Sequence, residues 1–152
     1  MNSNETEFLP HLTVAAIIED DGRYLLVEER DKGQLVYNQP AGHVEDGESF
    51  IQATVREVLE ETGRQFTAEA LIGCYRWRRE DNGETFVRIA LAGTVSDRDA
   101  AVSLDADIVA THWVSYDDIA SRLTLRSPLV LKCLDDYREG HRHPLSILRE
   151  LD

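Results

Sequence analysis

The sequence predicts an α/β fold of the mixed α+β kind, in which a mixed β-sheet lies between helices. Apolar, β-branched runs that pair as strands surround one strong amphipathic helix, and further helical segments follow it. This order of elements is typical of a sheet that is covered by helices. No internal repeat or linker divides the 152 residues, and this length suits a single domain with its own core.

The strands are predicted from apolar runs bounded by turn signals. Residues 11–30 form a hairpin, because two such runs flank the Asp20-Asp21-Gly22 turn. Residues 35–45 are extended, with bends at Pro40 and Gly42. The remaining predicted strands are 66–80, 84–96 and 110–115, the first two joined through the turn at 81–83. Two C-terminal helices are expected over 116–123 and 127–140, the second with Pro128 in its first turn.

The helix predicted over 49–63 has clear ends. Ser49 caps it, Gln52 completes a capping box, and Gly63 suits the left-handed position after its last turn. At about 100° per residue, one side faces the core and consists of Ile51, Val55, Val58 and Thr62, with Leu59 beside them. The same geometry puts Glu57, Glu60 and Glu61 on the opposite side.

These three glutamates raise a physical question, because like charges three or four residues apart on a helix repel each other. A solvated outer face would explain them simply. The alternative is a positive partner outside the helix, and the residues that surround the glutamates favour it. Gly42 lies upstream, Glu48 follows it after five intervening residues, and Arg56 follows after seven more.

Composition limits the partners of the protein. With 16 basic and 29 acidic residues, the net charge is −13 and the isoelectric point about 4.7. Nucleic acids and anionic membranes need a basic footprint, so neither is expected as the main partner. No apolar stretch is long enough to span a bilayer. Residues 1–12 lack the basic and apolar regions of a secretory signal, and residues 1–7 are expected to be a short tail. We therefore expect a cytoplasmic protein, as a monomer or a homodimer.

The stretch "GHVEDGESFIQATVREVLEETGR" (42–64) resembles the Nudix box, G-x5-E-x7-R-E-U-x-E-E-x-G-U, in which U is aliphatic. The matching positions are Gly42, Glu48, Arg56, Glu57, Val58, Glu60, Glu61 and Gly63. Arg64 departs from the pattern, although the stem of an arginine can lie along an apolar surface. The resemblance implies a single Nudix hydrolase domain over residues 8–145, folded as an α/β/α sandwich.

The resemblance also implies the chemistry. Nudix enzymes hydrolyse diphosphates that are linked to another moiety, with Mg²⁺ or Mn²⁺ bound by oxygen ligands. The implied metal ligands are Glu57, Glu60 and Glu61, with the carbonyl of Gly42 near the metal and its backbone free to turn. Glu57 or Glu60 would alternatively act as the general base. Arg56, paired with Glu48, would orient the glutamates. Asp107 is either a further acid of the site or an exposed loop aspartate.

Outside the box, the stretches "LTVAAIIEDDGRYLLVEE", "NQPAGHVE" and the tail 125–145 resemble the NudJ-type phosphatases within the family. That subgroup removes the terminal phosphate of nucleoside tri- and diphosphates and cleaves hydroxymethylpyrimidine diphosphate. For such a small phosphorylated substrate, the candidate binding residues are aromatic side chains for the ring and arginines for the phosphates. They are Tyr75, Trp77 or Tyr37, and Arg126, Arg78 or Arg88. A packing or surface role is the alternative for each.

Other functions stay open at this point. An ADP-ribose or oxidised-nucleotide pyrophosphatase would share the box but cleave internal phosphoanhydride bonds. A ligand-binding regulator would keep the fold without turnover, and such a protein is expected to lose an acid that this chain retains. A protein whose carboxylates serve only solubility or cation buffering would not need the spacing of the box.

Overall fold

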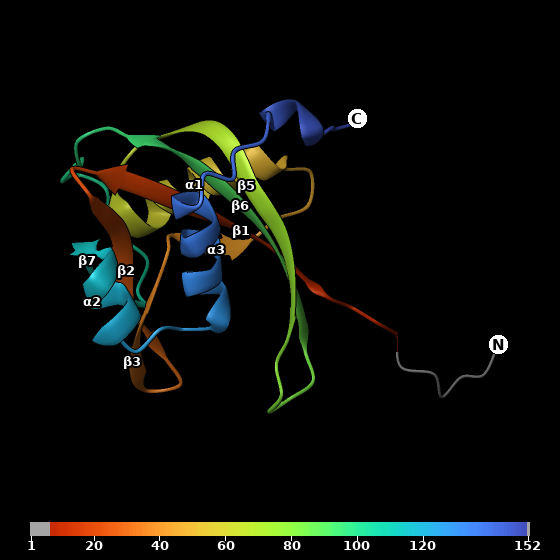
Figure 1. The fold of residues 1–152 in the computed structure, drawn as a ribbon, viewed down its shortest axis with the longest axis horizontal. Helices are drawn as coiled ribbons and strands as arrows, with labels where there is room; N and C mark the ends of the chain where they lie inside the picture. The colour runs from red at the N-terminus through yellow and green to blue at the C-terminus, as the bar shows by residue number, and fades with distance from the viewer. Residues whose placement is uncertain (1–6, 152) are drawn as a thin grey trace.

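The structure is a computed structural model that describes residues 7–151 (Figure 1). The expected tail 1–7 lies outside the described residues except for Glu7. The strands are β1 (His11–Asp20), β2 (Arg23–Asp31), β3 (Gln34–Asn38), β4 (Ala41–His43), β5 (Phe66–Arg78), β6 (Thr85–Val95) and β7 (Ile108–Ser115). The helices are α1 (Phe50–Thr62), α2 (Tyr116–Ser121) and α3 (Pro128–Arg138), followed by the 3-10 turn η1 (Leu145–Ile147). The predicted elements are thus confirmed, with small shifts at their ends.

The strands form one mixed sheet. Its order is β3-β2-β1-β6-β5, with β4 paired to β1 and β7 paired to β2. β1 and β6 run parallel, and the other pairs are antiparallel. The hairpin predicted over 11–30 is confirmed, and its turn residues Asp21 and Gly22 both have positive φ, as a tight turn between twisted strands requires.

The β1–β2 hairpin opens as it leaves this turn. The two strands pair only at Glu19–Tyr24 and Asp20–Arg23. Farther along, β1 pairs with β4 and β6, while β2 pairs with β3 and β7. The opening brings β4, which carries the first residue of the box, Gly42, into register with Val14 of β1. The start of the box therefore lies inside the fold, directly before α1.

Helices cover both faces of the sheet. Successive side chains of a strand point to opposite faces, so Val14, Ala16 and Ile18 of β1 join the core cluster that contains Val58 of α1. Ile17 joins the other cluster, with residues of α2 and α3 that include Ile119, Cys133 and Leu134. These two cores confirm the predicted α/β/α arrangement (Figure 1).

The ends of α1 agree with the prediction. Ser49 and Gln52 form the full capping box, and Gly63 has a left-handed φ of 73°. Glu57 and Glu61 are both buried, so a solvated outer face, the simple explanation of the acids, does not hold for these two. The reason is β4, which packs along this flank of the helix and covers it, a contact that helical periodicity alone does not reveal.

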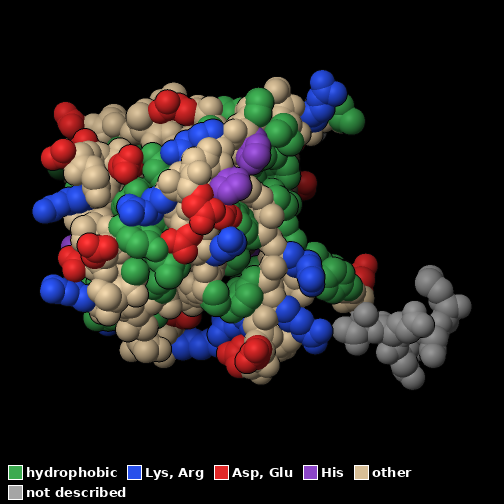
Figure 2. All heavy atoms as spheres, in the orientation of Figure 1, with side chains coloured by type: hydrophobic (Ala, Val, Ile, Leu, Met, Phe, Trp, Pro, Cys, Tyr) green, Lys and Arg blue, Asp and Glu red, His purple; other side chains and the backbone are tan. Residues whose placement is uncertain are grey.

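On the face of the molecule in Figure 2, basic side chains are scattered among acidic ones. None of the helices within residues 7–151 is long and apolar enough to cross a membrane.

Candidate active site

Three carboxylates gather at the C-terminal half of α1. Single oxygen atoms from Glu57, Glu60 and Asp105 all lie within 4.8 Å of one another. The glutamates come from one face of the helix, and Asp105 comes from the loop that precedes β7. The backbone N–H of Asp105 donates to the carbonyl of Glu60 at 3.0 Å, which fixes the loop against the helix. The arrangement offers the hard oxygen ligands that a divalent cation needs.

Arg56 connects this cluster to the loop before the helix. Its Nε and Nη2 donate to the two carboxylate oxygens of Glu48 at 2.8 and 2.7 Å. Its Nη1 donates to Glu57 at 2.8 Å and to Glu60 at 3.2 Å, and Nη2 also reaches the carbonyl of His43 at 2.9 Å. A guanidinium can hold several acceptors at fixed angles because its donors are planar and rigid. Arg56 therefore sets the positions of both glutamates.

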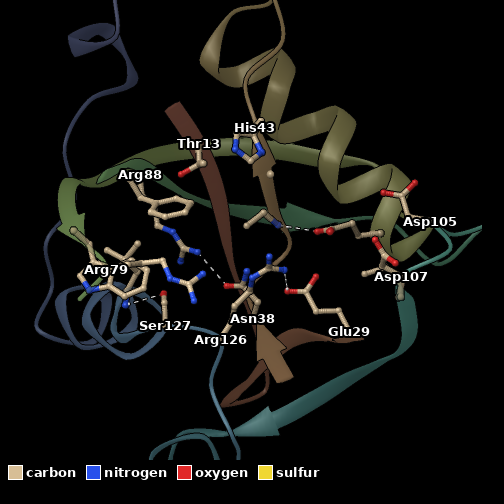
Figure 3. A pocket seen from close by; sticks show the side chains of 17 residues that line it. Thr13, Glu29, Asn38, His43, Arg79, Arg88, Asp105, Asp107, Arg126 and Ser127 are labelled. Carbon is tan, nitrogen blue, oxygen red and sulfur yellow. Dashed lines mark hydrogen bonds and ion pairs between the residues drawn. The ribbon is translucent and has the colours of Figure 1, made fainter. Parts of the chain in front are cut away.

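A pocket of about 230 Å³ opens beside the acids (Figure 3). The end near α1 and the loop before β7 is acidic and includes Glu61, Asp105 and Asp107. The lining at the other end comes from the sheet and the start of α3, and it includes Trp77, Phe86, Arg88, Ser127 and Leu129. The pocket therefore joins an acidic end to an aromatic and basic end, which suits a ligand that carries phosphates on a planar group.

Comparison with known proteins agrees with this geometry. The NUDIX domain family matches residues 9–132, which is most of the chain. The chain belongs to the Nudix family. It is 35% identical over 145 residues to "Phosphatase NudJ" from Escherichia coli strain K12, an alignment that covers 95% of this chain and 94% of that protein. The resemblance drawn from the box is confirmed, and the chain is a hydrolase.

Solved structures support the same assignment. A NUDIX hydrolase from Nitrosomonas europaea superposes with a TM-score of 0.90 at 49% identity, covering 94% of this chain and 98% of that one. A MutT NUDIX hydrolase from Burkholderia pseudomallei superposes with a TM-score of 0.72 at 25% identity, covering 84% of this chain and 98% of that one.

Burial changes the acidity of two glutamates in this Nudix hydrolase. Desolvation raises the pKa of Glu57 to about 7, although Arg56 opposes the shift. Desolvation raises the pKa of Glu61 to about 9, although the backbone N–H of Ala41 donates to its Oε1 at 2.8 Å. Without a cation, both carboxylates are thus held in an environment that disfavours their charge. Binding of a cation next to these carboxylates would stabilise their charged form.

The residues predicted from the box do not all meet at one point. Glu57 and Glu60 share the three-oxygen cluster, whereas the Oε1 of Glu61 is held by Ala41 on the β4 side and the residue lines the pocket. Gly42 also lines the pocket, next to Glu57. Glu48 contacts Arg56 rather than the other acids, as the resemblance implies.

The predicted substrate residues separate into two groups. Trp77 and Arg126 line the pocket, and Arg126 pairs with Glu29 at 2.7 Å. Tyr75 does not line the pocket as described over residues 7–151. Its ring packs against the core under α3, and its hydroxyl donates to Asp136 at 2.7 Å.

Asp105 and Glu29 are the acids of this region that sequence reasoning missed. Asp105 stands two residues before Asp107 in the same loop, so composition could not distinguish them. Asp107 lines the pocket but is not in the three-oxygen cluster, and its carbonyl accepts the N–H of Arg30 at 3.0 Å. Glu29 is buried on β2, where a strand pattern gave no sign of a site.

Arg64, which stands where the box pattern has an aliphatic residue, contacts Trp113 and the backbone of Ser96. Its guanidinium lies 5.5 Å from the ring centroid of Trp113, and its Nη1 donates to the carbonyl of Ser96 at 3.0 Å. A cation over an aromatic face takes the place of the aliphatic packing that the box pattern leads one to expect.

Proposed function

We propose that this Nudix hydrolase uses Mg²⁺ to release the terminal phosphate from nucleoside di- and triphosphates or from hydroxymethylpyrimidine diphosphate. The observation that carries the proposal is the cluster of Glu57, Glu60 and Asp105 oxygens at the acidic end of a pocket whose other end is aromatic. The "Phosphatase NudJ" similarity over nearly the whole chain supports phosphate release as the reaction. The functional unit proposed is the single domain 8–145.

The residues present fit a divalent cation. Three carboxylate oxygens within 4.8 Å of one another provide hard donors, and Arg56 is the cation that hydrogen-bonds two of these acids. Mg²⁺ binds such sites through a few carboxylates and completes its shell with water and phosphate oxygens. When bound, the ion supplies charge neutralisation of the diphosphate and acidifies a coordinated water. Mn²⁺ has the same ligand preference and is expected to replace it.

The side chains around the cation site then have distinct roles. Arg56 holds Glu57 and Glu60 in place through Nη1, while Glu48 keeps the guanidinium in position from the other side. Glu57 or Glu60 accepts the proton of the attacking water. Glu61, held by the Ala41 amide, contributes a further negative charge next to the cation.

The rest of the pocket positions the substrate. Trp77, which lies partly buried at the aromatic end, offers a ring face to the heterocycle. Arg126 meets a phosphate oxygen on the pocket side while Glu29 holds its Nη1. Asp107 lines the acidic end as a further acid that can accept a proton or approach the metal.

Product analysis tests this proposal. ATP, GDP, ADP-ribose and hydroxymethylpyrimidine diphosphate are incubated with the protein and either Mg²⁺ or EDTA, and phosphate, pyrophosphate and nucleoside monophosphate are quantified. Release of single phosphates that EDTA abolishes is the expected result. Pyrophosphate from ATP, or AMP from ADP-ribose, would instead indicate cleavage of an internal phosphoanhydride bond. No product from any compound would overturn the proposed activity.

A further inference from the structure

Arg88 is a buried cation at the aromatic end of the pocket. It lies on β6, lines the pocket and has only 5% of its surface exposed. Its Nη2 donates to the side-chain oxygen of Asn38 at 3.1 Å (Figure 3). Its Nη1 donates to the side-chain oxygen of Gln39 at 2.9 Å. Nη1 also lies 3.9 Å from the sulfur of Cys133, and Nε has no hydrogen-bond partner. The guanidinium is therefore held by neutral groups and is only partly satisfied.

No carboxylate oxygen within residues 7–151 lies at ion-pair distance from Arg88. The two other arginines of the pocket differ in this respect, because Arg126 pairs with Glu29 and Arg79 pairs with Asp81. A buried charge without a counter-charge is unfavourable, and buried charged groups normally have a partner. Among the three arginines that line the pocket, Arg88 is thus the one without a negatively charged partner in the described part of the chain.

The strand register shows what lies beside Arg88. Phe86, two residues earlier on β6, pairs with His11 of β1 on one side and with Trp77 of β5 on the other. Ring centroids are 4.5 Å apart for His11–Phe86 and 5.6 Å apart for Trp77–Phe86. Residues i and i+2 of a strand share a face, so Arg88 lies next to this row of rings on the same side of the sheet.

We propose that Arg88, held by Asn38 and Gln39, recognises a heterocycle whose edge presents adjacent hydrogen-bond acceptors, as the O6 and N7 atoms of guanine and hypoxanthine do. A guanidinium has only donors, and its fork matches two neighbouring acceptors. Adenine presents an amino donor in place of the oxo group, so the same edge would meet donor against donor. The inference rests on the proposed function, because it takes the acidic end as the place of the phosphates.

The aromatic row favours a base over a further phosphate at this end. Trp77 and Phe86 offer apolar ring surface, which a planar heterocycle covers and a hydrated phosphate does not. Leu129, at the start of α3, adds apolar surface to the same part of the lining. Arg88 then supplies the directional contact that ring surfaces alone lack.

The test compares IDP with ADP, which differ at the C6 substituent and the adjacent ring nitrogen. For the wild-type enzyme with Mg²⁺, kcat/KM is expected to be at least about tenfold higher for IDP, the size expected of one good bidentate contact. Asn38→Asp places a carboxylate against the guanidinium without changing the side-chain shape, and it should reduce this preference to about one. Arg88→Lys keeps the charge and loses the fork, with the same expected effect. Gln52→Glu, at the start of α1, makes the same change of charge elsewhere and should leave the preference intact.

Calorimetric binding of IMP and AMP to the metal-free protein provides a readout that does not depend on turnover. Tighter binding of IMP that Asn38→Asp and Arg88→Lys both remove would support the inference even if no diphosphate were hydrolysed. Equal handling of IDP and ADP by the wild-type protein would overturn it, as would a preference that survives both substitutions. Binding of inorganic phosphate that Asn38→Asp abolishes, without base preference, would also overturn it and would make Arg88 an anion site. A failure of the proposed function alone would appear as absent phosphate release with the IMP preference retained.

Discussion

Gly42 of β4 packs directly against the carboxylate of Glu57 on α1. A methyl group at position 42 would overlap the carboxyl carbon and both oxygens of Glu57. The residue lies in a strand and is not among the glycines of positive φ within the described chain, so the prediction of a glycine-dependent turn here is wrong. Glycine is needed because strand and helix approach so closely, and this contact fixes where the Glu57 carboxylate can lie.

Gly42→Ala should therefore displace Glu57 while leaving the fold intact. We expect kcat to fall by roughly 100-fold, the scale of loss when a catalytic group moves by about 1 Å. The measurement is steady-state phosphate release, together with circular dichroism to confirm folding.

The control is the double variant Gly42→Ala/Glu57→Asp, in which the shorter acid makes room for the methyl group. It should recover part of the activity relative to Gly42→Ala, whereas Glu57→Asp alone should be impaired. Full activity of Gly42→Ala would contradict the assigned contact.

Substitution can distinguish the roles of Asp105 and Asp107 in Mg²⁺ binding. Asp105→Asn removes one oxygen ligand of the three-carboxylate cluster and is expected to weaken Mg²⁺ binding and activity by at least about tenfold. Asp107→Asn leaves the cluster unchanged and should have a smaller effect on Mg²⁺ affinity. Titration of activity with Mg²⁺ measures both. A larger effect of Asp107→Asn on the Mg²⁺ requirement would show that the acids have the opposite roles.

The contrast between these two aspartates illustrates what the sequence could predict. The caps of α1 and the β1–β2 turn depend on residues close in sequence, so local rules found them. Asp105 joins the site only because its N–H meets the carbonyl of Glu60 in the last turn of α1, far from it along the chain. Tyr75 and Trp77 were equal candidates as aromatic residues of one predicted strand, yet Tyr75 packs against α3, and the placement of a helix is a tertiary property. The burial of Glu57 and Glu61 depends on β4 in the same way.

Arg56→Lys should show whether Arg56 acts by positioning the glutamates or only by its positive charge. Lysine keeps the positive charge but cannot donate at once to Glu48, Glu57 and Glu60, as the guanidinium does. We expect a 10- to 100-fold loss of kcat or Mg²⁺ affinity, in the range known for groups that orient metal ligands. Arg122→Lys, at an exposed position after α2, is the matched control and should retain wild-type activity. Wild-type Mg²⁺ dependence in Arg56→Lys would show that charge alone is sufficient.

The Glu48–Arg56 pair should also make stability depend on pH. Hydrogen bonds from Arg56 lower the pKa of Glu48 below its ordinary value of 4.5. A carboxyl group with a lowered pKa in the folded state stabilises the protein above its unfolded pKa, and this contribution is lost as the pH falls through the folded pKa. Urea unfolding at pH 7 and at pH 3 should therefore show a larger loss of stability in the wild type than in Glu48→Gln. The expected difference is on the order of 1 kcal/mol. Glu69→Gln, at an exposed position on β5, should behave like the wild type, and an equal acid loss in Glu48→Gln would show that the pair does not contribute.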